Sequence, residues 1–355
     1  MIRRDENSIN IYHDKKNEEG YKRVLPGQFV IHLRSFQGGF AHSAIEGITS
    51  PAYTVFGFSE LEKHNPNFWK YVFTSKEFIR RLETVTYGIR DGRSISYDEF
   101  LTMDFVFPTQ DEQTKIANYL DTLDRLITLH QRKYDKLTKV KKAMLEKMFP
   151  ENGSSYPEIR FKGFTDAWEQ RELRTAATFS KGSGYSKNDL KENGTPIILY
   201  GRLYTKYETV ISEVDTFVDV QPNSVYSTGH EVIVPASGET AEDISRASFV
   251  AKSGILLGGD LNIIVPDDYI NPVFLALTIS NGNQQKELSK RAQGKSVVHI
   301  HNSDLENVVL LYPKYEEQEK IGEYFSKLDS LITLHQRKLE KLKNIKKACL
   351  EKMFV

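Results

Sequence analysis

Apolar side chains recur at alternating steps of four and three residues in two separate stretches of the chain. Such a spacing, kept over three heptads, is typical of a helix that buries one seam against another helix. The seam positions are Ile116, Leu120, Leu123, Ile127, His130, Tyr134 and Leu137, and Ile321, Phe325, Leu328, Ile332, His335, Leu339 and Leu342. The pattern therefore predicts two helices of about 35 residues, each roughly 50 Å long at 1.5 Å per residue.

The two predicted helices are copies of one another. The octapeptide LITLHQRK stands at residues 126–133 and again at residues 331–338, an offset of 205 positions (335 − 130 = 205 for the two histidines). A period of this length is that of a whole domain with its connector. The chain is therefore expected to consist of two tandem units.

Each predicted helix needs a partner for its seam, and we expect the two copies to pair in an antiparallel arrangement. The alternative is that each helix packs only on its own domain. His130 and His335 occupy seam positions, where a polar residue most often fixes the register; a pH switch or a metal site is the other interpretation. The lysines near both helix ends complement the helix dipole or form a solvated face.

A mixed α/β pattern occurs once in each unit. GQFVI (27–31), NPNF (65–68) and DGRS (91–94) match GHEVI (229–233), NPVF (271–274) and QGKS (293–296) in order. Each Asn-Pro predicts the start of a helix that continues to DGRS or QGKS. The expected fold class is α+β, with two mixed α/β domains (1–108 and 151–312) joined by two helical segments (109–150 and 313–355) that form an antiparallel coiled coil.

Some short motifs resemble catalytic signatures. NPVF with FSKGSG (179–184) is similar to the Asn-Pro-Pro-Phe and Gly-rich motifs of amino-group methyltransferases, but the second proline is missing and the first unit has no Gly-rich loop. A helix start with proline in its first turn explains both copies. QGKS lacks the upstream glycine of a P-loop. A metal pair at His299 and His301 is not expected without a third ligand nearby.

DGRS and QGKS share a glycine, a cation and a hydroxyl. This combination suits a phosphate oxygen, because the backbone can approach closely and a charge and a donor are in reach of one anion. A tight turn with a solvated cation is the alternative interpretation.

The amino-acid composition narrows the classes of protein to which the chain could belong. The 355 residues fit about two domains, and the formal net charge of zero gives no support to a general coating of polyanions, although local basic patches remain possible. The single cysteine, Cys349, excludes an internal disulfide framework and favours a reducing compartment. Since no run of eighteen or more apolar residues and no signal-peptide core is present, a soluble cytoplasmic protein is expected.

Together these features resemble the specificity subunit of type I restriction-modification enzymes, over essentially the whole chain. The resemblance is carried by the helix starts DEQ (111–113) and EEQ (316–318), the repeated LDxLITLHQRK, the repeated KKAxLEKMF, and FKGFTDAWEQREL at residues 161–173. It implies two variable target-recognition domains separated by two helical regions.

The resemblance also implies a function. Each recognition domain would read one half of a bipartite site in double-stranded DNA, and the helices would act as a spacer and hold two methyltransferase subunits, which restriction subunits join. No catalytic residue, metal or cofactor is expected in this subunit: the methyltransferase would use S-adenosylmethionine, and the restriction subunit ATP and Mg. Only twenty-six residues precede Gly27, against about sixty between Trp168 and Gly229, so a truncated first recognition domain is expected. Whether another chain completes it stays open.

Loops rich in cations, hydroxyls and aromatic rings supply the candidate DNA contacts, because such groups hold phosphates and read base edges. They are Arg34, Ser35, Arg90, Arg93 and Ser94 in the first unit, and Lys181, Ser183, Tyr185, Lys187, Arg202, Tyr204, Lys295 and Ser296 in the second. Two other interpretations stay open. One is a coiled-coil scaffold for methyltransferase subunits without sequence readout; the other, an adenine methyltransferase, needs a cofactor loop that the first unit lacks.

Overall fold

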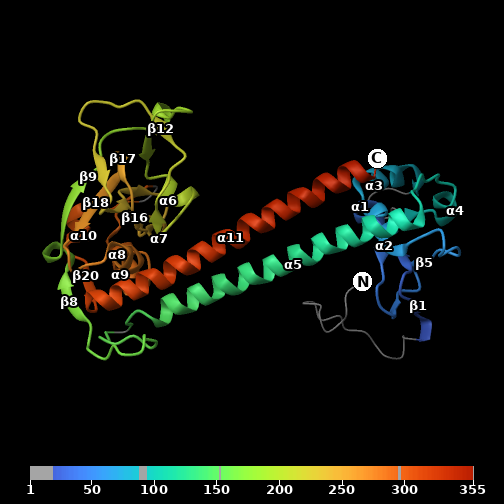
Figure 1. The fold of residues 1–355 in the computed structure, drawn as a ribbon, viewed down its shortest axis with the longest axis horizontal. Coiled ribbons are helices and arrows are strands. Elements are labelled where there is room, and N and C mark those ends of the chain that lie inside the picture. The colour runs from blue at the N-terminus through green and yellow to red at the C-terminus, as the bar shows by residue number, and fades with distance from the viewer. Residues whose placement is uncertain (1–18, 88–93, 152, 295–296, 355) are drawn as a thin grey trace. The chain divides into compact units, whose positions relative to one another are not determined.

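The computed structural model describes residues 19–87, 94–151, 153–294 and 297–354, with only the backbone of Tyr87 and Glu242. The chain divides into two compact units, which we call unit 1 (residues 1–133 and 335–355) and unit 2 (residues 134–334). Each unit contains one globular domain and one end of each of two long helices (Figure 1). Both units combine helices with β-sheets, so the α+β class is confirmed.

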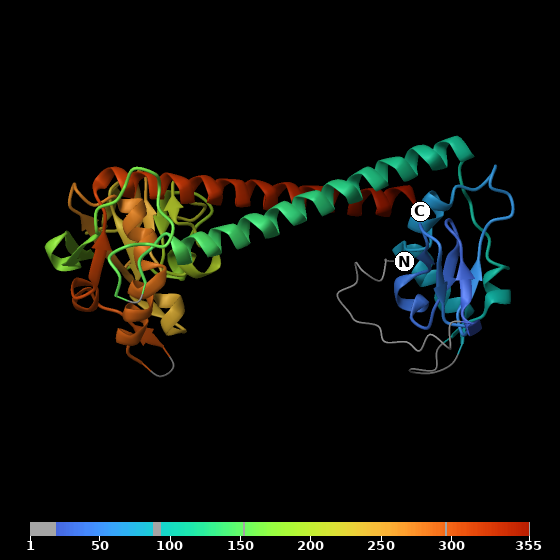
Figure 2. The same ribbon diagram turned by 90° about the horizontal axis from the view of Figure 1, so that it is seen from below.

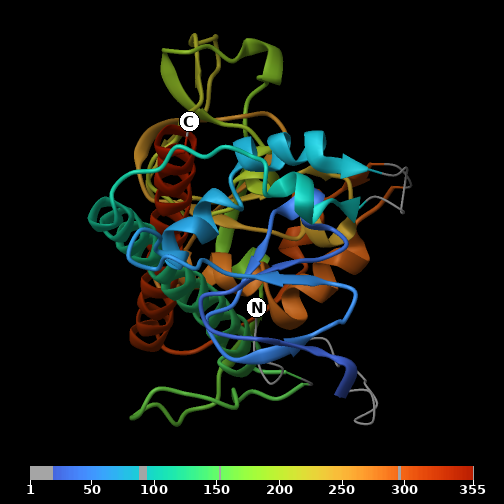
Figure 3. The same cartoon turned by 90° about the vertical axis from the view of Figure 1, so that its right-hand side faces the viewer.

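Unit 1 is built from short elements. Its strands are β1 (Lys22–Val24), β2 (Phe29–Ile31), β3 (Ala41–His42), β4 (Gly47–Thr49), β5 (Thr54–Phe56), β6 (Thr86–Tyr87) and β7 (Ser94–Ile95). Its short helices are α1 (Ser35–Gly38), α2 (Pro66–Val72), α3 (Lys76–Leu82), the 3-10 helix η3 (Glu83–Val85) and α4 (Tyr97–Phe100). Strand β2 lies between β3 and β5 in an antiparallel sheet, with Phe29 opposite both His42 and Phe56. Figure 3 shows the blue strands of unit 1 facing the viewer.

Aromatic rings fill the core of unit 1. Phe29, Phe40 and Phe73 are almost completely buried. The ring of Phe40 lies 5.4 Å from Phe73 and 4.9 Å from Phe100. Because each ring buries a large apolar area, strands of two or three residues suffice to form this core.

Unit 2 contains larger sheets. Its strands are β8 (Glu169–Glu172), β9 (Ala177–Lys181), β10 (Thr195–Ile198), β11 (Val210–Ile211), β12 (Phe217–Val218), β13 (Tyr226–Thr228), β14 (Val232–Pro235), β15 (Ser237–Gly238), β16 (Ser248–Val250), β17 (Ser253–Leu257), β18 (Leu261–Pro266), β19 (Val298–His299) and β20 (Val309–Tyr312). Its helices are the 3-10 helices η5 (Leu173–Thr175) and η6 (Lys187–Asp189), and α6 (Arg202–Thr205), α7 (Ala241–Ile244), α8 (Pro272–Ile279), α9 (Gly282–Arg291) and α10 (Asn302–Glu306). One mixed sheet has the order β11-β16-β14-β18-β9 and the other β12-β10-β17-β13.

The central strand β14 of unit 2 is buried along its whole length. Successive side chains of a strand point to opposite faces. Val232 and Val234 accordingly belong to the same core cluster as helix α8, whereas Ile233 packs with Ile198 and Leu257 of the second sheet. The apolar run in GHEVIVP therefore reflects a strand that is covered on both faces.

Both Asn-Pro motifs start a helix, as predicted. The side chain of Asn65 accepts a hydrogen bond from the amide of Asn67, Asn271 caps α8 in the same way, and proline occupies the first turn in both. The predicted length was wrong: each helix ends early and a second one follows, α3 in unit 1 and α9 in unit 2. The break in unit 2 falls at Gly282, whose φ of 66° favours glycine.

The two predicted long helices are present as α5 (Gln110–Lys147) and α11 (Tyr315–Met353) (Figure 2). They run antiparallel in each unit: Asp124 pairs with Lys346 in unit 1, and Lys141 with Asp329 in unit 2, both at 2.5 Å. The interpretation that each helix packs only on its own domain was therefore wrong. Within the described part of the chain, no helix combines the length and the apolar character needed to cross a bilayer.

The seam positions of both helices are buried or half-buried. Leu120 and Phe325 are fully buried, whereas Leu129 and Leu334, outside the seam, are exposed. The seam residues Ile116, Leu123, Ile127, His130, Tyr134, Leu137, Ile321, Leu328, Ile332, His335, Leu339 and Leu342 range between buried and partly buried. The Nδ1 atoms of His130 and His335 lie 2.8 Å apart, so one imidazole donates a hydrogen bond to the other.

Candidate nucleic-acid interface

A buried glutamine attaches each domain to the start of its long helix. Gln113 accepts a hydrogen bond from the Asn65 amide at 2.9 Å and donates to the carbonyls of residues 63 and 108. Gln318 accepts one from the Asn271 amide at 2.8 Å and donates to the carbonyls of residues 269 and 313. Both side chains are completely buried. We call each of these buried contacts a glutamine joint. Sequence reasoning used DEQ and EEQ only as helix starts, although the same glutamine in both copies was a signal that could have indicated the joint.

Several loops of unit 2 converge where strands β9, β14 and β17 end. The Gly182 amide donates to the Leu261 carbonyl at 3.1 Å, and the Ala236 amide to the Asp260 carbonyl at 2.8 Å. Strand β15, which follows β14, pairs with β19 and places Ser237 opposite His299. We call this region the loop end of unit 2; it comprises residues 181–184, 199–206, 236–240, 258–260 and 297–301.

Three of the predicted DNA contacts at the loop end differ in exposure. Lys181 is exposed at the last position of β9. Ser183 is half-buried and its Oγ accepts a hydrogen bond from the Val225 amide at 3.0 Å. Tyr204 donates its hydroxyl to the Ser237 carbonyl at 2.5 Å, and burial raises the pKa of Tyr204. Lys181 is thus accessible to a phosphate, whereas the other two side chains shape the loops.

Tyr185 and Lys187 follow the loop end along the chain. The Tyr185 hydroxyl is 2.5 Å from Ser224 Oγ and accepts a hydrogen bond from the Gln221 amide at 2.8 Å. Lys187 lies exposed in η6. Of these two residues, Lys187 exposes its charged side chain to solvent, whereas Tyr185 is half-buried.

Arg202 is turned inward. Only 7% of its side chain is exposed, and its guanidinium pairs with Glu208 at 2.7 Å and Asp215 at 2.6 Å. Lys206 and then Arg202 lower the pKa of Asp215 to about 2. Arg202 therefore neutralises two carboxylates of its own domain. The local sequence around Arg202 does not indicate these two ion pairs.

Sequence reasoning missed two polar residues at the loop end and undervalued a third. Ser237 Oγ lies 3.1 Å from His299 Nδ1, which fixes the orientation of this exposed imidazole. The backbone of His299 also exchanges two hydrogen bonds with Gln293, at 3.1 and 2.8 Å. Tyr200 is 38% exposed, with its ring 6.0 Å from that of Tyr204. The predicted contacts Lys295 and Ser296 lie outside the described residues.

The equivalent loops of unit 1 carry fewer described candidates. Arg34 is exposed before α1, while Ser35 is completely buried and its Oγ accepts a hydrogen bond from the His32 amide at 2.9 Å. Ser94 is exposed at the start of β7, which packs against α1. Arg90 and Arg93 lie outside the described residues. Of the DNA contacts predicted in unit 1, Arg34 and Ser94 are therefore the described residues that are exposed.

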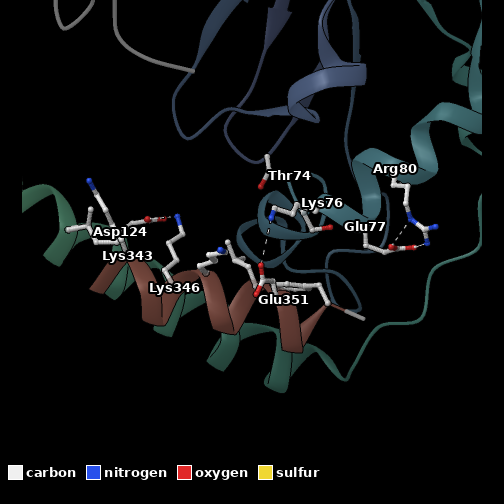
Figure 4. A pocket seen from close by; sticks show the side chains of 13 residues that line it. Thr74, Lys76, Glu77, Arg80, Asp124, Lys343, Lys346 and Glu351 are labelled. Carbon is white, nitrogen blue, oxygen red and sulfur yellow. Dashed lines mark hydrogen bonds and ion pairs between the residues drawn. The ribbon is translucent and has the colours of Figure 1, made fainter. Parts of the chain in front are cut away.

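Unit 1 also has a pocket of about 840 Å³ between α3, α5 and α11 (Figure 4). Lys346 pairs there with Asp124 at 2.5 Å and Lys76 with Glu351 at 3.7 Å, and Lys343 and Lys347 also line the pocket. Among the described residues, no group of three or more His, Cys, Asp or Glu side chains could hold a metal ion.

Comparison with known proteins finds relatives of this chain among type I restriction enzymes. A family model described as the type I restriction modification DNA specificity domain matches residues 165–344, about half of the chain. The MjaVIII type I restriction enzyme specificity subunit of Methanocaldococcus jannaschii is 24% identical over 251 residues, which cover 68% of this chain and 58% of that protein. The putative MjaX specificity subunit of the same organism is 24% identical over 268 residues, 72% of this chain and 59% of that protein. The chain spans less than two thirds of the length of these relatives.

A solved structure shares the fold. The S subunit of a type I restriction-modification system from M. genitalium superimposes with a TM-score of 0.61 and 14% identity, covering 94% of this chain and 84% of that one. At this identity the likeness shows the fold alone. It agrees with two mixed α/β domains and a pair of long helices.

Proposed function

The chain belongs to the family of type I restriction-modification DNA specificity domains, and from that premise we propose that it is the DNA-recognition subunit of a type I restriction-modification complex. In this proposal each unit reads one half of a bipartite site in double-stranded DNA. The pair of long helices holds two methyltransferase subunits, and restriction subunits join them. The subunit itself catalyses no reaction: S-adenosylmethionine is used by the methyltransferase, and ATP and Mg by the restriction subunit.

The observation that carries the proposal is the duplication of one domain on one type of helix joint. Gln113 and Gln318 make equivalent hydrogen bonds to equivalent helix starts. The Asp–Lys pair between the long helices is also repeated. Two domains held in the same way suit a target that consists of two separate half-sites.

The exposed cations suit the phosphate backbone. Lys181 and Lys187 in unit 2 and Arg34 in unit 1 are exposed, and such residues position a protein on DNA without reading its sequence. Side chains on fixed strands, such as His299 and Ser94, are better placed to contact base edges, because their backbone is held in a β-pair. The formal net charge of zero predicts that binding by the isolated chain is weak and strongly salt-dependent.

Methylation mapping tests the proposal. The chain is co-expressed with its methyltransferase subunit, and methylated adenines are mapped across a genome. We expect a motif with two defined halves and an unspecified gap. Replacing residues 236–240 and 297–301 by the loops of another specificity subunit should change one half and leave the other; an unchanged motif would contradict readout by unit 2.

A scaffold without its own sequence readout is the second candidate. It is favoured by the inward orientation of Arg202, the burial of Ser35 and the zero net charge. Under this alternative, the loop replacement leaves the methylated motif unchanged while the methyltransferase complex still forms. Size-exclusion chromatography of the same variant distinguishes this result from simple misfolding.

A further inference from the structure

The last part of the loop end, residues 297–301, is fixed to the core of unit 2 through Ile300. The Ile300 side chain is completely buried. Its amide donates to the Ala236 carbonyl at 3.1 Å, and its carbonyl accepts a hydrogen bond from Nδ2 of Asn262 at 2.9 Å. Because the side chain and both backbone groups of this residue are held, the backbone on either side of it is anchored to the core.

Asn262 is a polar residue inside an apolar strand. It lies in β18 between Leu261 and Ile263, and its side chain is completely buried. Its Oδ1 atom has no hydrogen-bond partner among the described residues. Burial of a polar group costs free energy unless the group is hydrogen-bonded. The bond from Nδ2 to the Ile300 carbonyl is therefore what this asparagine contributes in place of an apolar side chain: it positions residues 297–301.

His299 projects outward from this anchored backbone. Its side chain is exposed, and Ser237 lies opposite it in the pair of β15 and β19. Ser237 Oγ is 3.1 Å from His299 Nδ1, and the Tyr204 hydroxyl donates to the Ser237 carbonyl at 2.5 Å. A Cβ atom at Gly238 would lie 2.8 Å from the same hydroxyl oxygen, so glycine leaves room for the tyrosine. The imidazole is thus oriented by a chain of contacts that leads back to Tyr204.

The protein uses one of the two ring nitrogens of His299. Nε2 makes no hydrogen bond to any residue that the structure describes. This atom donates or accepts one hydrogen bond, according to which ring nitrogen carries the proton. Base edges in the major groove present both donors and acceptors. An oriented ring with one nitrogen available therefore suits a base edge, whereas the flexible, exposed chain of Lys181 suits a phosphate.

We propose that His299 reads one base pair in the half-site of unit 2, through a hydrogen bond between Nε2 and the base edge in the major groove. Ser237 acts through the imidazole and is a positioning residue, as is Asn262, which holds the backbone beside it. The assignment rests on the proposed function and adds to it the side chain that sets specificity at one position. Since contacts to separate base pairs act roughly additively, the effect of His299 is confined to that position.

Methylation mapping of the complex with the methyltransferase subunit tests this assignment. The measured quantity is discrimination, the ratio of methylation at sites with the preferred base pair to methylation at sites with another one. His299→Asn places an amide near the position of Nδ1 but does not reach that of Nε2, whereas His299→Gln reaches it. We expect discrimination at one base pair of a single half-site to fall at least about fivefold in His299→Asn, and less in His299→Gln.

Two further variants separate reading from positioning. Ser237→Ala leaves the imidazole in place but removes the group that orients it, so discrimination should fall at the same base pair by a smaller factor. The matched control is His230→Asn, the same substitution at an exposed histidine beside the opposite end of β14. It should leave discrimination unchanged at every position. Because His299 is exposed, none of its substitutions removes a core side chain.

Other results would overturn the assignment. These are a motif that His299→Asn leaves unchanged, a loss of discrimination spread over several base pairs, and a complete loss of methylation while size-exclusion chromatography still shows the complex. An effect of Ser237→Ala at a different base pair would also contradict it. Failure of the proposed function looks different, because the wild-type chain then gives no motif with two halves. If replacing residues 236–240 and 297–301 changes one half and His299→Asn changes nothing, the assignment of His299 alone is wrong.

Discussion

The two units share their attachment to the long helices but differ in what they build on it. The glutamine joint, the Asn-Pro helix start and the Asp–Lys pair occur in both. Among the described residues, the central sheet has three strands in unit 1 and five in unit 2. The first core is dominated by phenylalanine rings, the second by aliphatic side chains. The contacts that attach a domain to the long helices are therefore repeated, whereas the sheets and cores of the two domains differ.

The largest contrast between the units lies at the start of the long helices. Glu317 is buried against Arg160, whereas Glu112 is exposed. Removing one partner of a buried ion pair costs about 3–5 kcal/mol, because the other charge is left without compensation. Glu317→Ala should therefore lower the free energy of unfolding by that amount, and Glu112→Ala by less than about 0.5 kcal/mol. Urea unfolding followed by circular dichroism measures both; equal losses would remove the contrast.

The glutamine joint should respond equally in both units. Gln113→Leu and Gln318→Leu each leave one amide and two carbonyls without their hydrogen-bond partner. Unsatisfied buried groups cost roughly 1–3 kcal/mol, and we expect about that loss for each variant. Gln336→Leu, at an exposed position of α11, is the control. A loss confined to one of the two joints would show that the repeated hydrogen bonds are not energetically equivalent.

The features that sequence predicted well depend on local pattern. The 4-3 spacing identifies α5 and α11 because a buried seam needs that period. Asn65 and Asn271 mark helix starts because their side chains satisfy free amides at the first turn. These signals lie within a few residues of one another. Neighbouring positions were therefore enough to predict these helices, whereas the two-unit organisation came from the repeat 205 positions apart.

The features that sequence missed depend on partners far along the chain. Arg202, at the start of α6, has the same local sequence whether it faces a phosphate or the carboxylate of Asp215. Gln318 finds Asn271, 47 positions away, only after the domain has folded. His299 is a candidate DNA contact only because β19 places it beside Ser237, which holds its imidazole. Such contacts are set by tertiary structure, which spacing alone does not encode.

Two exposed lysines of unit 2 should contribute to DNA binding without distinguishing one sequence from another. Lys181→Ala and Lys187→Ala in the complex with the methyltransferase subunit should each weaken binding to all sequences alike. If each lysine neutralises one phosphate, the slope of log affinity against log salt should shrink by about one unit per substitution. Filter binding over a salt series measures this slope. Lys252→Ala, at the opposite end of β17, is the matched control, and an equal change there would refute a localised phosphate contact.

The smallest expected effect lies where the two sequence copies contact each other directly, at His130 and His335. Burial, then the nearby His335, Lys338 and Lys133, lower the pKa of His130 below its ordinary 6.5. Below pH 6.5 the unfolded chain therefore takes up a proton that the folded chain resists, and stability falls as the pH drops toward the folded pKa. We expect a small fall in the thermal midpoint between pH 7 and pH 5, and a flatter profile in the double variant His130→Leu, His335→Leu, which keeps the seam apolar. If wild type and double variant lose stability in parallel over this range, the acid sensitivity comes from other groups and the pair only sets the register of the helices.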